Sequence, residues 1–214
     1  GVKDTSMHYF LHPAFTFGEE ELLGFWVAKF EPSGSASNIS IKPNVSSLRS
    51  MKIGDQFDAA YNMRNNSKYG WSSTEVDTHM MKNTEWGAVA YLSQSEYGAN
   101  AEIWINNSST FITGCAGNSV SAGEYNGCQN AYNTTNGQKA STTHNIYGVY
   151  DMSGGAWDRV AAYVDNGDSN LSNGQSIINA DIKYKDVYSK GSSDTSSNNY
   201  EANKNKYGDA VYET

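Results

Sequence analysis

The stretch from Asn145 to Asp158 reads Asn-Ile-Tyr-Gly-Val-Tyr-Asp-Met-Ser-Gly-Gly-Ala-Trp-Asp and is the most informative part of the chain. Glycine and serine recur at short intervals in this stretch, which is typical of turns. The residues that follow, from Trp157 to Val164, combine aromatic and β-branched side chains and predict a strand. We therefore expect turns that lead into a strand in this part of the chain.

Other strands are predicted on both sides of this stretch. The apolar run from Leu23 to Glu31 is closed by Pro32 and Gly34 and predicts a buried strand. Two shorter strands are expected at 102–106 and 109–113, around an Asn-Ser turn. The polar, repetitive residues 189–206 predict a loop.

Two helices are predicted between these strands. Phe57, Ala60, Tyr61 and Met63 give residues 54–64 an amphipathic spacing. A second helix is expected from a cap at Thr78 to about residue 95, with Met81, Ala88, Val89 and Leu92 on its apolar face and Gly98 just past its end.

The composition indicates a folded domain whose core depends on aromatic residues. Leu, Ile, Val and Phe make up only 16% of the 214 residues, whereas 15 Tyr and 5 Trp supply large buriable surfaces. Asn, Ser and Gly account for about a third of the chain, so loops should outweigh regular structure. The net charge of −8 argues against nucleic acid as a partner, and no apolar run is long enough to cross a membrane.

The two cysteines predict a disulfide bond. Cys115 and Cys128 are flanked by glycine and enclose a loop of a length that disulfides commonly close. Two unrelated thiols are the alternative reading. A disulfide would place the protein in an oxidising compartment, outside the cytosol.

No residue pattern predicts catalysis or a transition metal. His8 and His12 are four residues apart, but Pro13 argues against a helix that would bring them together. His79 and His144 stand alone in the sequence. Asp151 and Asp158 invite a paired-carboxylate reading, but such spacing is common on any acidic surface. We therefore name no catalytic, cofactor-binding or metal-binding residue.

Three stretches resemble the formylglycine-generating-enzyme (sulfatase-modifying factor) family. Pro43-Asn44-Val45-Ser46 and the helix after it look like one family segment, and residues 84–91 are similar to the family's Glu-x-Glu-Trp-Glu-x-Ala helix. Residues 145–158 resemble its Asn-x-x-Gly-Leu-Tyr-Asp-Met-x-Gly-Asn-Val-Trp-Glu block. The amino-acid sequence of this block also looks like that of modules in secreted or surface proteins of gut Firmicutes. The resemblance implies an α+β, C-type-lectin-like fold with two helices, short antiparallel strands and long loops.

Departures from the family pattern bear on activity. Catalytic members hold copper with a cysteine pair near their C-terminus, whereas Cys115 and Cys128 lie upstream of the Asp-Met-Ser-Gly block. Gly155 stands where the family has an asparagine that helps to hold calcium, although Asp158 keeps a carboxylate. We expect no cofactor, with calcium the one ion left open, and a domain that lacks the family's last strands.

The sequence thus predicts residues 1–22 as an N-terminal extension or linker and residues 23–214 as one domain. We expect a non-enzymatic extracellular or cell-surface module for adhesion or recognition of a protein or glycan. A self-assembling subunit of a pilus, surface filament or phage tail is the alternative, and an oxidase relative is the second alternative. Direct membrane insertion is not expected.

Overall fold

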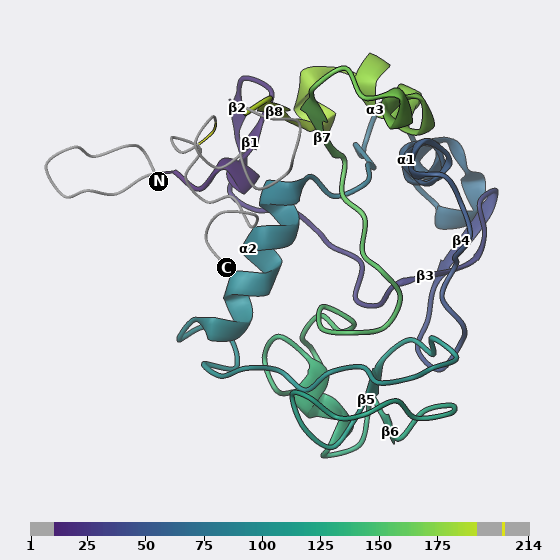
Figure 1. The fold of residues 1–214 in the computed structure, drawn as a ribbon, viewed down its shortest axis with the longest axis vertical. Helices are drawn as coiled ribbons and strands as arrows, with labels where there is room; N and C mark the ends of the chain where they lie inside the picture. The colour runs from purple at the N-terminus through teal and green to yellow at the C-terminus, as the bar shows by residue number, and fades with distance from the viewer. Residues whose placement is uncertain (1–10, 192–202, 204–214) are drawn as a thin grey trace, which may run out of the picture. The chain divides into compact units, whose positions relative to one another are not determined.

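The computed structural model describes residues 11–191 and Asn203, and it has a mixed α+β architecture in which coil predominates (Figure 1). The chain divides into two compact units. Unit 1 comprises residues 1–25, 51–88 and 159–214, and unit 2 comprises 26–50 and 89–158. The described part of the predicted N-terminal extension contains a short 3₁₀ helix and a strand pair. Most of the loop predicted at 189–206 lies outside the described residues.

Unit 1 is built from helices and two strand pairs around one apolar cluster. Its described strands form an antiparallel pair, β1 with β2, and a parallel pair, β7 with β8. Their bounds are β1 Thr16–Phe17, β2 Glu20–Glu21, β7 Ala162–Asp165 and β8 Asp186–Ser189. Helix α1 lies beside α3, as Figure 1 shows. The buried cluster consists of Phe57, Met80, Ala161, Ile177 and Tyr184.

The helix predicted at 54–64 is confirmed as α1, Ile53–Asn62, which continues into a 3₁₀ turn at Met63–Asn65. Its spacing places Phe57 in the core, and the core then holds the helix in place. Helix α3, Gln175–Asn179, was not predicted. Five residues are too few to show a helical period in the sequence.

Helix α2, Asn83–Gln94, begins later than predicted. Thr78 does not cap it, because the Thr78 hydroxyl instead accepts from the Arg64 backbone N–H and donates to the Tyr61 carbonyl. The start is fixed by Glu85, whose carboxylate accepts the backbone N–H of Lys82 at 2.8 Å, as in half of a capping box. The end agrees with the prediction, and Gly98 lies beyond it. Residues to Ala88 belong to unit 1 and the rest to unit 2.

Unit 2 contains two antiparallel hairpin-like pairs and long loops. The pairs are β3 Pro32–Ser35 with β4 Asn38–Ile41, and β5 Cys115–Ala116 with β6 Asn130–Ala131. Its buried apolar cluster contains Phe30, Ala116, Ala140 and Tyr150, and the rings of Trp104 and Tyr132 pack against it. The prediction of an aromatic core therefore holds for this unit.

Four strand predictions are wrong in whole or part. The segment Leu23–Ala28 forms no strand and has no partner strand among the described residues, and Leu23 and Trp26 are exposed. Residues 102–106 and 109–113 form isolated bridges only, because their backbone groups bond to several different segments. The strand predicted at Trp157–Val164 begins only at Ala162. Strands need long-range partners, which a local apolar run does not reveal.

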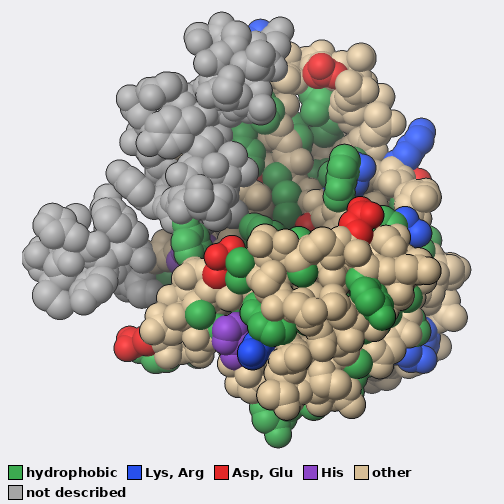
Figure 2. All heavy atoms as spheres, turned by 60° about the horizontal axis from the view of Figure 1, so that its bottom comes forward, with side chains coloured by type: hydrophobic (Ala, Val, Ile, Leu, Met, Phe, Trp, Pro, Cys, Tyr) green, Lys and Arg blue, Asp and Glu red, His purple; other side chains and the backbone are tan. Residues whose placement is uncertain are grey.

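Among the described residues, no helix combines the length and apolar character needed to cross a membrane. The face drawn in Figure 2 consists mainly of uncharged polar side chains and backbone, with few charged groups between them. This surface follows from a sequence in which charged residues are only 18%.

Candidate functional site

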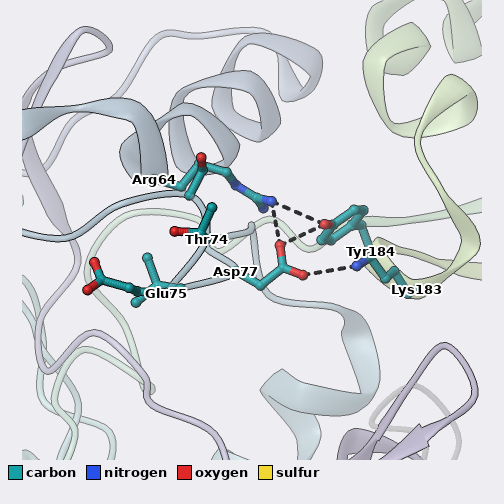
Figure 3. Close-up of a pocket in the computed structure, with 8 residues that line it drawn as sticks. Arg64, Thr74, Glu75, Asp77, Lys183 and Tyr184 are labelled. Atoms are coloured by element: carbon teal, nitrogen blue, oxygen red, sulfur yellow. Dashed lines mark hydrogen bonds and ion pairs between the residues drawn. The ribbon is translucent and has the colours of Figure 1, made fainter.

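A polar pocket of about 360 Å³ opens on unit 1 (Figure 3). Its residues come from the turn after α1, the loop at 73–77, and the 3₁₀ turn Ile182–Tyr184. The lining residues are Arg64, Ser73, Thr74, Glu75, Val76, Asp77, Lys183 and Tyr184. Two hydroxyl groups and two carboxylates, those of Glu75 and Asp77, stand on exposed loop residues, so the rim suits a polar ligand.

Asp77 connects the charged groups of the pocket. Its carboxylate accepts from the Tyr184 hydroxyl at 2.6 Å and from Lys183 Nζ at 3.0 Å, and it lies 2.5 Å from a terminal nitrogen of Arg64. Burial by itself would raise the pKa of Asp77. The hydrogen bonds from Tyr184 and Lys183 and the two positive charges outweigh burial, so the pKa of Asp77 is lowered. The carboxylate is therefore ionised across the physiological range.

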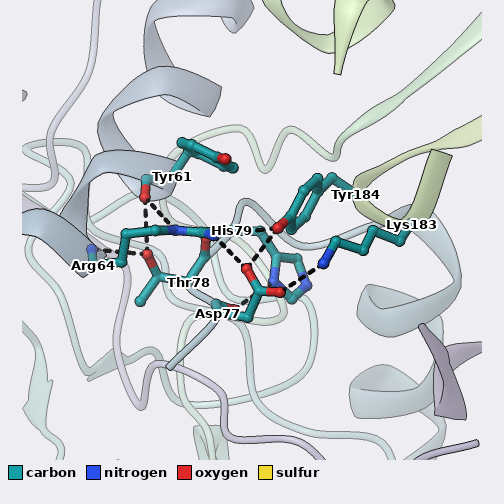
Figure 4. Close-up of polar contacts among 7 residues, drawn as sticks. All are labelled: Tyr61, Arg64, Asp77, Thr78, His79, Lys183 and Tyr184. Carbon is teal, nitrogen blue, oxygen red and sulfur yellow. Dashed lines mark hydrogen bonds and ion pairs between the residues drawn. The ribbon is translucent and has the colours of Figure 1, made fainter. Parts of the chain in front are cut away.

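Arg64 is fixed by contacts on all sides of its guanidinium (Figure 4). Its Nε donates to the Tyr61 carbonyl at 3.0 Å, and its terminal nitrogens donate to the Tyr184 hydroxyl and the Thr78 carbonyl. The guanidinium carbon also lies 3.8 Å from the centre of the Tyr61 ring. These bonds satisfy the charge internally, so Arg64 stiffens the pocket and holds Asp77 in place.

The half-buried His79 and the buried Lys82 and Glu85 form a charged group close to the pocket. His79 Nε2 lies 3.1 Å from each carboxylate oxygen of Glu85, and Lys82 Nζ lies 3.7 Å from Glu85 Oε1. Burial lowers the pKa of His79, but the hydrogen bond and charge of Glu85 outweigh burial, and the pKa is raised. Sequence reasoning left His79 as a lone histidine because Glu85 was assigned only to a helix.

A second polar centre lies in unit 2, where Glu31 and Asp151 are both buried. Asp151 accepts from the backbone N–H groups of Glu31 and Gly114 and from the Asn106 side chain, at 2.8–3.2 Å. Burial raises the pKa of Asp151 to about 6 despite these donors. Asp151 also has a left-handed backbone with φ 63°, a conformation that costs energy in a residue other than glycine.

Glu31 faces a different set of partners. Its Oε1 accepts the Ala156 N–H at 2.9 Å, and its Oε2 contacts the Ser47 hydroxyl. Burial, followed by the charge of Asp151, raises the pKa of Glu31 to about 8. The Ser47 hydroxyl also lies 3.1 Å from the Phe111 carbonyl. Since a hydroxyl has one proton, a protonated Glu31 that donates to Ser47 lets Ser47 donate to Phe111 and satisfies all three groups.

Gly155 makes room for this arrangement. It has φ 77°, and a Cβ atom there would lie 2.6 Å from Glu31 Oε1. The sequence comparison singled out Gly155 only as a missing calcium ligand. In the structure the position is occupied by the Glu31 carboxyl group, so the absence of a side chain has a packing reason.

The structure confirms the predicted disulfide between Cys115 and Cys128, with a Cα–Cα distance of 5.4 Å. The bond links β5 to the residues just before β6 and closes a loop whose ends are already paired. A crosslink of this span stabilises by about 3 kcal/mol in the chain-entropy model.

The remaining predicted positions are dispersed. His8 lies outside the described residues, and His12 caps a 3₁₀ helix by accepting the Ala14 N–H. Burial lowers the pKa of His144. The surface interpretation of the two aspartates is wrong for Asp151, which is buried because it accepts backbone donors, whereas Asp158 is exposed. Within the part of the chain that the structure describes, no three acidic, histidine or cysteine side chains gather as a metal site would need.

Two tryptophans are the most prominent exposed groups of unit 2. Trp26 is fully exposed and Trp157 is 90% exposed. Their segments run together, since the Lys29 carbonyl accepts the Tyr150 N–H at 2.9 Å and Glu31 binds the Ala156 N–H. Trp104, by contrast, is half-buried, and Lys139 Nζ lies 4.3 Å from the centre of its ring.

Comparison of the chain with models of known protein families gave no match, and comparison with curated proteins also gave none.

Proposed function

We propose that the chain is a non-catalytic extracellular or cell-surface module that recognises a protein or glycan ligand on a fold of the C-type-lectin-like, formylglycine-generating-enzyme-like kind. The α+β architecture with short strand pairs and long loops supports this fold, and the disulfide bond supports an oxidising location. The family resemblance of residues 145–158 supplies the fold type.

The exposure of Trp26 and Trp157 is the observation that carries the proposal. A tryptophan ring that covers no core contributes little to folding. When a partner covers the ring, a large apolar surface is removed from water, which favours binding. Aromatic residues are enriched at binding sites for the same reason, and they commonly provide most of the binding energy. The segments that carry these rings are joined by the Tyr150 N–H bond to the Lys29 carbonyl and by the Ala156 N–H bond to Glu31.

The test is a glycan-array and surface-protein screen with the intact chain, followed by affinity measurements on variants. We expect Trp26→Ala and Trp157→Ala to weaken binding by about 30-fold, which corresponds to about 2 kcal/mol at an interface hot spot. Tyr97→Ala removes another exposed ring, just after α2, and serves as the matched control. Unchanged affinity in both tryptophan variants would refute the proposal.

A structural subunit is the second candidate, and the segment Leu23–Ala28 favours it. In the described part of the chain, the backbone of Gly24–Ala28 takes part in no hydrogen bond, and Leu23 and Trp26 are exposed. A segment whose backbone groups are free can pair as a strand with a strand of another molecule. Size-exclusion chromatography and negative-stain imaging at rising concentration test this candidate. Filaments would support it, whereas monomers at every concentration would count against it.

A further inference from the structure

Both ring nitrogens of His79 face hydrogen-bond acceptors. Nδ1 lies 3.1 Å from the Asp77 carbonyl oxygen, and Nε2 lies 3.1 Å from the Glu85 carboxylate. Neither oxygen can donate a proton when Glu85 is ionised. A neutral imidazole has one N–H group, whereas the protonated ring has two, so only the protonated ring satisfies both acceptors. The site is therefore built for the cationic form of His79.

The charged groups around His79 have opposite effects on its protonation, and Glu85 is its main partner. Glu85 is buried and also accepts the Lys82 backbone N–H, while the Lys82 ammonium group opposes a positive charge on His79. The other titratable groups of the packed elements are engaged elsewhere. The Asp77 carboxylate binds Arg64, Lys183 and Tyr184, and Asp186 accepts the Thr84 N–H, while Glu20 and Glu21 on β2 are exposed.

The His79 ring packs on Phe17, which belongs to the β1–β2 hairpin. The two ring centres are 5.2 Å apart, and the rings are inclined by 30°. The Phe17 ring also meets Tyr184 edge-on at 5.4 Å and lies 4.9 Å from Lys183 Nζ. Lys82 Nζ donates to the Thr16 carbonyl at 2.9 Å. Phe17 and the Thr16 carbonyl thus join strand β1 to the rest of unit 1, and the His79 ring supplies one face of the Phe17 contact.

We propose that His79 is a pH-sensitive latch that holds the β1–β2 hairpin against the rest of unit 1 when its ring is protonated and loosens the hairpin when the ring loses its proton. Loss of the proton leaves one ring nitrogen with its lone pair directed at an oxygen atom. That contact is repulsive, and the ring relieves it by turning away from Glu85 or Asp77. Turning removes the flat face on which Phe17 packs, and loss of the proton has already removed the positive charge beside the Phe17 ring.

The test compares amide hydrogen exchange of the hairpin with titration of the His79 ring in the same protein. The reporter amides are those that bond within β1–β2 and the Leu22 N–H, which donates to the Phe15 carbonyl at 2.7 Å. After correction for the intrinsic pH dependence of exchange, we expect protection to fall by roughly threefold to tenfold as pH rises through the His79 titration. That range is the equivalent of about one net hydrogen bond. The imidazole chemical shifts give the ring's midpoint, which must coincide with that of the hairpin.

Variants separate the latch from a general effect of pH. His79→Gln does not titrate and should abolish the pH step in hairpin protection, whereas His144→Gln, in unit 2, should keep it. Phe17→Leu should leave the ring titrating but uncouple the hairpin from it. A hairpin step that persists in His79→Gln overturns the proposal. If that variant fails to fold, a mismatch between the two midpoints in the unaltered protein overturns it equally.

Discussion

Replacement of Glu31 by glutamine should change how the stability of the protein depends on pH. The pKa of this carboxyl is about 8 in the folded chain against a reference value of 4.5, chiefly because of burial. The folded state therefore binds more protons than the unfolded state between these pH values, so the free energy of unfolding falls as pH rises through that window. Each pKa unit corresponds to about 1.4 kcal/mol, which sets an upper limit of about 5 kcal/mol for Glu31 alone.

The contacts of Glu31 allow glutamine to imitate its protonated form. A glutamine carbonyl can accept the Ala156 N–H, and its amide can donate to Ser47, which then donates to the Phe111 carbonyl. We expect Glu31→Gln to match the unaltered protein at pH 5 to within about 1 kcal/mol, the typical net contribution of one hydrogen bond. At pH 8 it should be more stable by about 2–4 kcal/mol, a value below the limit because a charged Glu31 can relax toward water.

The assay is urea unfolding followed by tryptophan fluorescence at pH 5, 6, 7 and 8. Glu102→Gln removes an exposed carboxylate from the same unit and should keep the original slope. Asp151→Asn is the contrasting variant, because Asp151 accepts three donors and an amide would turn a donor toward one of them. It should lose about 2–4 kcal/mol at pH 5. The loss should shrink toward pH 8, because the raised pKa of Asp151 means that its ionisation destabilises the unaltered protein there. A slope in Glu31→Gln equal to that of the unaltered protein would refute the reasoning.

Three further predictions concern stability. Cys115→Ser combined with Cys128→Ser should lower the free energy of unfolding by about 3 kcal/mol in a denaturant titration, and a loss below about 1 kcal/mol would mean that β5–β6 pairing already closes the loop. Arg64→Lys should cost about 2–3 kcal/mol, because an ammonium group cannot reach the acceptors that the guanidinium bonds together; a thermal shift under 2 °C would contradict this. Gly155→Ala should cost about 1–3 kcal/mol, because its φ is 77° and its Cβ would meet Glu31; an unchanged unfolding midpoint would show that the loop yields freely.

Local features of the sequence were sufficient where neighbouring residues decide the structure. Helix α1 follows from apolar spacing around Phe57, and the pairing of Cys115 with Cys128 follows from the even cysteine count and the short loop. Both depend on residues within a few turns of chain. The start of α2 was missed because the Thr78 hydroxyl binds Arg64, 14 residues away, in place of the helix end.

The polar centres could not be predicted, because their members are far apart in the sequence. Glu31 meets Asp151 across 120 residues, and Asp77 meets Lys183 across 106. Whether a carboxylate is charged depends on its burial and on the donors that the fold brings to it. The same holds for Leu23–Ala28, where an apolar run predicted burial but the described fold places no strand beside it. The sequence by itself determined the α+β class, one helix and the disulfide bond, whereas tertiary contacts alone decided which side chains are buried, ionised or exposed, since these properties belong to an environment made by distant parts of the chain.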